Sequence, residues 1–268
     1  MQKRILIVSQ EVFPYISEGN IAENVLDLAK IVKKNPGVEV RLFMPKYGCV
    51  NERRHQLHEV IRLSGVNIVV NDIDQPLIVK VASVPQARLQ VYFIDNDEYF
   101  QRKLVLEDKN KKLIKDNDER MMFFCRGVLE TLQMLGWKPD IIHCHGWFTA
   151  LLPLYLKTIY AGHPVFESTQ VLSSFYKTSI KGTLNKELIN KIKFDGIEDE
   201  LIECIANPDA ESLQSIATKF SDGVILPNNY ESPHIVQLAN ANNIPVLNPE
   251  EHVEYYNFYK NFFSEALV

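Results

Sequence analysis

The chain has 268 residues, of which 46% are hydrophobic and 24% are charged, and its formal net charge is −5. It is long enough and apolar enough for one large α/β domain, which argues against a disordered chain. The negative charge, without a stripe of lysine and arginine between aromatic residues, argues against a nucleic-acid partner.

The cysteines and the N-terminus indicate the compartment. Cys49, Cys125, Cys144 and Cys204 form no Cys-x-x-Cys pair, which is typical of reduced thiols. The apolar run that begins at Ile5 is too short for the core of a signal peptide, and no window approaches the roughly 18 apolar residues of a membrane helix. We therefore expect a cytoplasmic protein with no membrane partner.

The first elements predict a parallel sheet. Residues 4–9 form a continuous apolar run that is typical of a buried strand, and residues 38–45 form a second one. Between them, apolar side chains recur at helical spacing from 21 to 32, and Pro36 and Gly37 follow. This β-loop-α-β order is the crossover unit of a Rossmann-like, doubly wound sheet.

The pattern changes after residue 57. Residues 57–95 read as short strands of a mixed or antiparallel insertion, and a charged loop follows at 106–119. A long helix is expected at 117–135, with acidic residues in its first turn. Strands are then expected at 139–145 and 163–169, with a helix at 147–160 between them.

The last third continues the alternation after a stretch without strong periodicity to about 207. Helices are expected at 212–220 and 229–241, and strands at 222–227 and 244–248. The sequence thus predicts one α/β domain over 1–248, with a single Rossmann-like parallel sheet. An amphipathic helix over 249–268, beginning at Pro249, is expected to pack on it.

An ordered series of segments carries a family resemblance. It consists of "ILIVSQEVFPY" (5–15), "SEGNIAENV" (17–25), "MPKYG" (44–48), "NDERMMFF" (117–124) and "PDIIHCHGWFTALLP" (139–153). Over residues 1 to about 235 the chain resembles the N-terminal catalytic domain of bacterial glycogen synthases and plant starch synthases. The resemblance implies half of a GT-B fold, transfer of glucose from ADP-glucose to an α-1,4-glucan, and neither a metal nor a cofactor.

The first loop departs from the family pattern. The family reads Lys-Thr-Gly-Gly-Leu-Ala-Asp there, and Ser17 stands at the lysine, whereas Gly19 is retained. The resemblance places this loop at a helix N-terminus that favours the donor's diphosphate. Glu18 and Glu23 would bring competing carboxylates to that place. Asn20 and Glu23 instead predict an ordinary helix start that resembles a capping box.

Two further motifs are also altered. The family's His-x-His-Asp-Trp-His is matched by His145 and Trp147, but Gly146 replaces the aspartate and a phenylalanine replaces the last histidine. The family's Ile-His-Asn corresponds to residues 168–170, where Thr169 and Gln170 stand in place of the histidine and the asparagine. A glycine cannot bind a sugar hydroxyl through a side chain, and neither threonine nor glutamine reproduces an imidazole.

The resemblance therefore implies a substrate cleft with no assignable catalytic residue. The degenerate positions are Gly146, Thr169 and Gln170. The residues expected to bind substrate are Ser17, Gly19, Asn117, Asp118, Arg120, His145 and Trp147. At the start of the long helix, local charge pairing among Asp118, Glu119 and Arg120 is the alternative to a role in substrate binding.

Other chemistries are disfavoured. His143, Cys144 and His145 are unlike a metal site because neighbouring strand residues point to opposite faces, and no second Cys/His cluster completes a shell. There is no Gly-x-Ser-x-Gly elbow and no Gly-x-Gly-x-x-Gly after the first strand. The aromatic residues at 255–263 suggest a further hypothesis. If part of this run is exposed, it marks a surface for a protein partner or a glycan.

Two functional hypotheses follow. The family's second domain, which holds the nucleotide, is not expected within these residues, so the chain could be a reduced glycosyltransferase completed by a separate C-terminal domain or by a homo-oligomer. It could instead be a non-catalytic domain, a pseudoenzyme, that binds ADP-glucose, an α-glucan or a protein and regulates glycogen metabolism. The altered motifs predict that the isolated chain is catalytically impaired.

Overall fold

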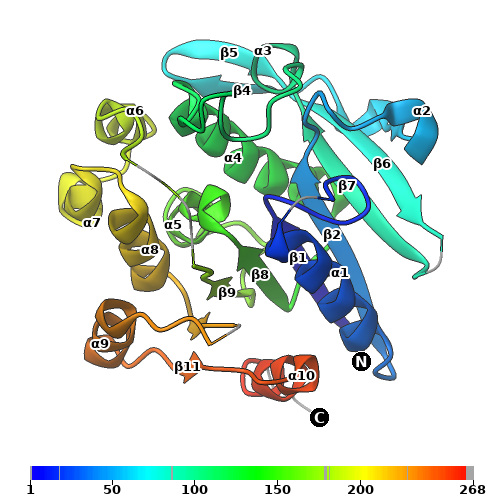
Figure 1. Ribbon diagram of the computed structural model, residues 1–268, viewed down its shortest axis with the longest axis vertical. Helices are drawn as coiled ribbons and strands as arrows, with labels where there is room; N and C mark the ends of the chain where they lie inside the picture. Colours follow the sequence, from blue (N-terminus) through cyan, green and yellow to red (C-terminus); the bar gives the residue numbers. More distant parts are fainter. Residues whose placement is uncertain are drawn as a thin grey trace.

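The computed structural model describes residues 2–17, 19–85, 87–177, 180, 182–227 and 229–263. A nine-stranded sheet with the order β11-β10-β9-β8-β1-β2-β7-β6-β3 forms its centre (Figure 1). Its strands are β1 (Lys3–Ser9), β2 (Val38–Pro45), β3 (His58–Glu59), β6 (Ile78–Val84), β7 (Leu89–Asp95), β8 (Ile141–His145), β9 (Gln170–Ser174), β10 (Gly223–Ile225) and β11 (Val246–Leu247). From β11 to β7 the strands are parallel, whereas β6 and β3 are antiparallel to their neighbours.

Helices cover both faces of this sheet. They are α1 (Asn20–Lys33), α2 (Glu52–His55), α3 (Asp97–Phe100), α4 (Asn117–Leu135), α5 (Leu151–Lys157), α6 (Leu188–Phe194), α7 (Asp199–Ile202), α8 (Ala210–Lys219), α9 (Pro233–Ala241) and α10 (His252–Lys260), with 3-10 turns η1 (Ile61–Leu63), η2 (Trp147–Thr149) and η3 (Glu203–Ile205). Alternate residues of β8 mark the two faces, because His143 contacts Tyr259 of α10 whereas Cys144 interacts with Cys125 of α4. The predicted doubly wound α/β fold is confirmed.

The predicted β insertion is smaller than expected. β7 lies within the parallel sheet beside β2, so only β3 to β6 depart from the doubly wound pattern. Strands β4 (Asn67–Val70) and β5 (Ile73–Pro76) form a separate antiparallel hairpin. In Figure 1 this hairpin lies beyond the end of the main sheet, above α4.

The strand predicted at 163–169 is wrong. Residues 164–168 form turns, and β9 begins only at Gln170. Val165 and Phe166 are buried side chains of these turns, so their apolar character reflects packing on the core rather than a strand. This shift matters for the site, because it changes which residues lie at the carboxyl end of the strand.

The predicted C-terminal helix is present as α10, but it begins at His252 rather than at Pro249. Glu251 is the N-cap, and it forms a reciprocal capping box with Glu254. The helix lies beside α1 (Figure 1).

The aromatic side chains of this segment face the core. Tyr255, Phe258 and Tyr259 are buried, and Tyr256, Phe262 and Phe263 are half-buried against the core. The described part of this aromatic run therefore gives no support to the hypothesis of an exposed aromatic surface.

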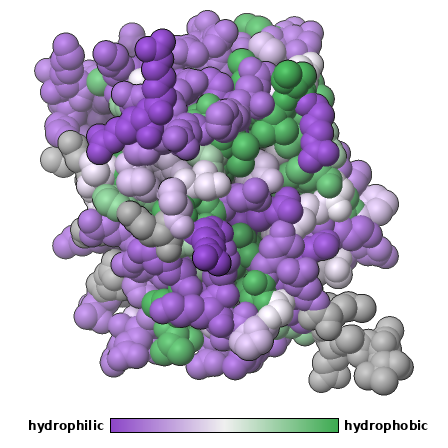
Figure 2. Space-filling view, turned by 90° about the vertical axis from the view of Figure 1, so that its right-hand side faces the viewer, coloured by the Kyte–Doolittle hydropathy of each residue, from purple (hydrophilic) through white to green (hydrophobic). Residues whose placement is uncertain are grey.

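The face of the molecule beside β6 is mainly hydrophilic, with hydrophobic residues between the polar ones (Figure 2). In the part of the chain that the structure describes, no helix combines the length and the apolar character needed to cross a bilayer.

Candidate functional site

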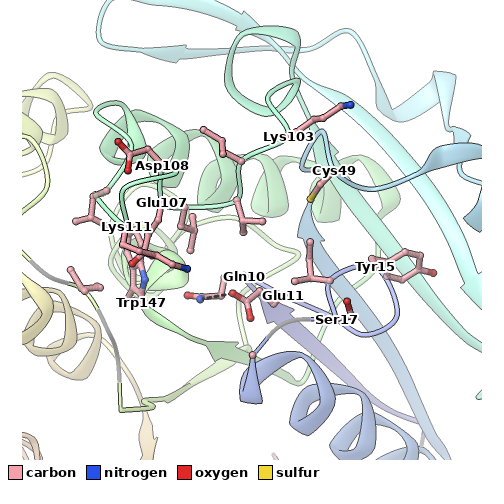
Figure 3. Close-up of a pocket in the computed structure, with 17 residues that line it drawn as sticks. Gln10, Glu11, Tyr15, Ser17, Cys49, Lys103, Glu107, Asp108, Lys111 and Trp147 are labelled. Carbon is pink, nitrogen blue, oxygen red and sulfur yellow. Dashed lines mark hydrogen bonds and ion pairs between the residues drawn. The ribbon is translucent and has the colours of Figure 1, made fainter.

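A cleft of about 650 Å³ opens at the carboxyl ends of β1, β2 and β8 (Figure 3). Gln10 and Glu11 directly follow β1, Cys49 lies in the loop after β2, and Trp147 follows β8. Residues 103–108, 111 and 113 form the opposite side, which we call the cleft wall, and Tyr15, Ile16, Ser17, Gly19 and Ile180 complete the lining. The carboxyl edge of a parallel sheet is where α/β proteins bind ligands.

Glu11 is the titratable group in the middle of the cleft (Figure 3). Burial raises the pKa of its carboxyl group to about 7, although a hydrogen bond from Gln10 Nε2 to Glu11 Oε1, at 3.3 Å, acts in the opposite direction. An added Cβ at Gly19 would lie 2.9 Å from Glu11 Oε2, so this carboxyl group lies beside the start of α1. Glu11 can therefore exchange a proton near neutral pH within the cleft.

Ser17 and Gly19 lie in the cleft lining, and their role in binding substrate stays a prediction. Gly19 is the N-cap of α1 with a φ of 116°, and no side chain caps this helix end. The prediction of a capping box formed by Asn20 and Glu23 is therefore wrong. Asn20 is already the first residue of the helix, and the N-cap, Gly19, has no side chain that could cap it. Glu23 is exposed in the first turn, and Glu18 lies outside the described residues.

Gly146 lies behind the cleft, and Trp147 lines it. Gly146 has a φ of 84°, a conformation that side chains disfavour. A Cβ at this position would lie 2.4 Å from Gln10 Oε1, so the side chain of Gln10 occupies the space that a larger residue at 146 would need. Gln10 Oε1 also accepts a hydrogen bond from the Phe148 N–H, at 3.3 Å.

Asn117 and Arg120 do not reach the cleft, because both side chains are fully buried. The Arg120 guanidinium donates to the backbone oxygens of Tyr99 and Val105, at 2.9 and 2.8 Å, and to Asn117 Oδ1, at 2.6 Å. Asn117 Nδ2 donates to the Leu106 oxygen, at 2.7 Å. These two residues hold the cleft wall from behind, so a role in binding substrate directly is corrected to a positioning role.

Asp118 is also buried, and it forms an ion pair instead of facing the cleft. Lys191 Nζ of α6 lies 2.6 Å from Asp118 Oδ2 and 2.6 Å from Glu119 Oε1. Tyr99 donates a hydrogen bond to Glu119 Oε2, at 3.1 Å. The start of α4 is therefore a charge cluster that joins α4 to α6, which agrees with the alternative of charge pairing at a helix start.

His145 does not line the cleft either. It shares a sheet face with His143, since the two are separated by two positions in β8, and their rings are 3.9 Å apart. His145 Nδ1 is 2.7 Å from the Tyr176 hydroxyl, and His145 Nε2 is 3.1 Å from His143 Nδ1. Burial lowers the pKa of His145 to about 3. Both imidazoles are thus neutral parts of the packing between β8 and α10.

Thr169 and Gln170, which were aligned with the family's histidine and asparagine, do not line the cleft. Both residues lie at the amino end of β9, where Gln170 pairs with Ile141, whereas the carboxyl end of the strand pairs Ser174 with His145. Thr169 Oγ1 is buried and donates to the Pro139 oxygen, at 2.8 Å. The length of β9 therefore separates these residues from the edge where the cleft opens.

We expect Gln170→Ala to leave ligand binding in the cleft unchanged, because its side chain lies at the opposite edge of the sheet. Isothermal titration of the variant and the unmodified protein with an α-1,4-glucan oligosaccharide measures this. A loss of affinity in a variant with an unchanged melting temperature would contradict the placement of the site.

Sequence reasoning missed Gln10, Glu11 and the lysines of the cleft wall, Lys103 and Lys111. A signal for the first two was present, because polar residues directly after a buried parallel strand lie at the ligand-binding edge. The lysines had no such signal, since they belong to a charged loop that only the fold brings opposite β1.

The arrangement suits a neutral, hydroxyl-rich ligand. The cleft presents the Gln10 amide, a carboxyl group with a near-neutral pKa and an indole, and its wall carries Lys103 and Lys111 together with Glu107 and Asp108 (Figure 3). Amides and carboxyl groups bind hydroxyls, and aromatic rings pack on apolar faces. The described residues contain no group of three or more His, Cys, Asp or Glu side chains that could hold a metal ion.

Comparisons with known proteins agree with this architecture. The glycogen synthase of Chlorobium limicola is 40% identical over 190 residues, which are 70% of this chain and 39% of that enzyme. The glycogen synthase of Chlorobium chlorochromatii is 41% identical over 184 residues, or 67% of this chain and 37% of the enzyme. The chain thus spans less than half the length of these relatives.

A solved structure shows the same fold. The catalytic domain of starch synthase IV from Arabidopsis thaliana, bound to ADP and acarbose, superposes with a TM-score of 0.73 at 20% identity, covering 92% of this chain and 52% of that one. A family model described as the starch synthase catalytic domain matches residues 4–232. Because that match covers most of the sequence, the chain belongs to the family of starch synthase catalytic domains.

Proposed function

We propose that this chain binds the glucosyl units of an α-1,4-glucan in the cleft, as one half of a glucosyltransferase whose nucleotide-binding half comes from residues outside these 268. The observation that carries the proposal is the cleft itself, which places Gln10, Glu11 and Trp147 at the carboxyl edge of the sheet in a member of this family. In a reaction of this kind, positioning and charge stabilisation provide most of the rate enhancement. A cytoplasmic location is part of the proposal.

The charges at the start of α1 favour a sugar over a diphosphate. A helix N-terminus attracts anions, and here the Glu11 carboxyl group already lies beside Gly19. Position 17 is a serine, so no cation is supplied there. A diphosphate at this place would meet a carboxylate above neutral pH. The described residues alone would therefore support little transfer from ADP-glucose.

The second candidate is a non-catalytic glucan- or partner-binding domain that regulates glycogen metabolism. The observation that favours it is at Gly146, where the side chain of Gln10 excludes an acidic residue from the cleft floor. The half-enzyme and a glucan-binding regulatory domain both require that the cleft binds glucan. They differ in whether a supplied second domain restores transfer.

The experiment is a titration of the purified chain with maltoheptaose by isothermal calorimetry, with ADP in a parallel titration. We expect maltoheptaose to bind and ADP to bind far more weakly. Trp147→Ala is expected to weaken maltoheptaose binding by at least about tenfold, through loss of ring packing. Absence of maltoheptaose binding by the unmodified chain would refute the proposal.

A transfer assay then separates the two candidates. Labelled ADP-glucose and glycogen are incubated with the chain, with and without the separately expressed C-terminal part of the Chlorobium limicola glycogen synthase. Transfer that needs both parts supports the half-enzyme. Glucan binding without transfer in any combination, including added extract of the source cells, supports the regulatory domain.

A further inference from the structure

We propose that Gln10 is the specificity-determining residue of the cleft: it takes the place that a side chain at position 146 would occupy, and it presents its amide together with Glu11 to vicinal hydroxyls of a glucosyl unit. This inference rests on the proposed function and deepens it. It concerns a residue to which the family resemblance assigned no role, although the segment 5–15 contains it.

Gln10 and position 146 exclude each other sterically. A Cβ at Gly146 would lie 2.4, 2.6 and 2.9 Å from Oε1, Cδ and Cγ of Gln10. Three successive side-chain atoms of Gln10 therefore lie in that space, and Gln10 is only 5% exposed. A side chain at 146 could enter only if Gln10 were shortened or moved, so the two positions form an interlocked pair.

Hydrogen bonds fix the Gln10 amide in this position. Oε1 accepts from the Phe148 N–H at the first turn of η2, at 3.3 Å. Nε2 donates to Glu11 Oε1, also at 3.3 Å. The backbone N–H of Gln10 donates to the His145 oxygen, at 3.4 Å, which ties the residue to the end of β8. The amide is thus held between the ends of two strands rather than projecting freely.

This geometry leaves a donor beside an acceptor. An amide nitrogen carries two hydrogens, and the bond to Glu11 uses one of them. The second hydrogen is available to a ligand in the cleft that Gln10 lines. Adjacent donor and acceptor groups match the alternating roles of two neighbouring sugar hydroxyls, and a neutral amide does not repel an uncharged ligand. The ionised Glu11 carboxyl group would repel an anion, so Gln10 and Glu11 together favour a glucosyl unit over an anion.

Gln10 also influences the proton on Glu11. A hydrogen bond to a carboxylate favours its charged form, so loss of the amide raises the carboxyl pKa further above its present position near 7. The pH dependence of binding therefore reports on Gln10 separately from its contact with the ligand. Shortening a residue that only filled space would let water reach Glu11 and move its titration to lower pH, which is the opposite direction.

The test uses Gln10→Ala and Gln10→Glu, with Gln237→Ala, an exposed position on α9, as the matched control. Maltoheptaose is titrated into each protein between pH 5.5 and 8.5, and the Glu11 carboxyl carbon is followed by NMR. We expect Gln10→Ala to weaken binding about tenfold and to move the Glu11 titration to higher pH. Gln10→Glu should weaken binding most above neutral pH, where two carboxylates would face each other. Gln237→Ala should change neither quantity.

A thermal-melting cycle tests the interlock without any ligand. Gly146→Ala should lower the melting temperature strongly, through the contact with Gln10 and the strained φ, and Gln10→Ala should recover part of that loss. Equal losses with glutamine and with alanine at position 10 would overturn the interlock.

The outcomes separate this inference from the function on which it rests. If the unmodified chain binds no maltoheptaose, the proposed function fails and the role of Gln10 in specificity fails with it. If the unmodified chain binds and Gln10→Ala keeps both the affinity and the Glu11 titration, the role of Gln10 is overturned while the proposed function stands.

Discussion

Lys191→Met is expected to lower the free energy of unfolding by about 3–5 kcal/mol, which is the usual cost of removing one partner of a buried ion pair. Asp118 is fully buried, and the Lys191 ammonium lies 2.6 Å from its carboxylate. Without the lysine, the carboxylate of Asp118 keeps its burial but loses its counter-ion. Chemical denaturation of both proteins at pH 8, monitored by circular dichroism, measures the difference.

The pH dependence of this loss has a definite sign. Burial raises the pKa of Asp118, so the folded state holds its proton more tightly than the unfolded state. Stability contributed in this way is present at low pH and is lost as the pH rises through the raised pKa. Removing Lys191 raises that pKa further, so the deficit of Lys191→Met should shrink when both proteins are compared at pH 5 instead of pH 8.

Two controls distinguish this mechanism from general damage to α6. Lys193→Met removes the partially exposed ion pair between Lys193, which lies on α6 like Lys191, and Asp199 of α7, and it should change stability little. The double variant Asp118→Asn, Lys191→Met should recover most of the loss, because no fully buried charge remains and Glu119, which also loses Lys191, is only half-buried. A loss in the double variant as large as in Lys191→Met alone would show that packing, not charge, is responsible.

Acidification from pH 7 to pH 5 is expected to lower the free energy of unfolding by about 2 kcal/mol through His145, and to lower it further through His143. Burial lowers the pKa of both imidazoles, to about 3 for His145 and well below the ordinary value for His143. The unfolded chain therefore binds more protons than the folded one below pH 6.5. Stability is present above that pH and falls as the pH decreases toward the folded pKa.

The surroundings of the two histidines explain why neither is charged. The Tyr259 hydroxyl lies 2.6 Å from His143 Nδ1, and the Ser174 hydroxyl lies 2.7 Å from His143 Nε2. Besides Tyr259, the ionisable groups of α10 that lie near the two rings are His252, which disfavours a charge on His145, and Tyr255. No carboxylate appears among the described contacts of either ring. A proton on this pair would consequently have no counter-ion.

Urea denaturation at intervals between pH 7 and 5 measures this effect, with His145→Gln as the test variant. The variant should have a lower stability at pH 7 but a clearly smaller loss on acidification. His58→Gln, at an exposed position of β3, should follow the unmodified protein. If His145→Gln lost as much stability on acidification as the unmodified protein, another group would be responsible.

Helix α4 has the bounds that the sequence predicted. Apolar residues at helical spacing predicted a helix over 117–135, and the structure has it at Asn117–Leu135. Local periodicity sufficed because the same side chains that set the pattern also pack on the sheet. The parallel strands β1 and β2 were predictable for a related reason, since strands buried on both faces read as continuous apolar runs.

The site was less predictable, because a residue that matches the family pattern can be either buried or exposed to the cleft. Arg120 and His145 match the family pattern, yet Arg120 holds the cleft wall from behind and His145 packs under α10. Thr169 and Gln170 were predicted at the carboxyl end of a strand because buried turn residues resembled one, whereas they lie at the amino end of β9, one strand length from the cleft edge. Burial and register arise from contacts between distant segments, and a single sequence does not contain them.

The sequence by itself determined the fold class, the order of the main elements and the family, because strand and helix periodicities and the ordered motifs are local properties. Only the tertiary structure decided which polar residues face the cleft. Gln10 enters the site because Gly146 leaves space for it, although 136 positions separate the two in the sequence. Lys191 pairs with Asp118 because α6 returns to the start of α4. Such packing between distant segments decides whether a polar side chain faces the cleft or lies in the interior.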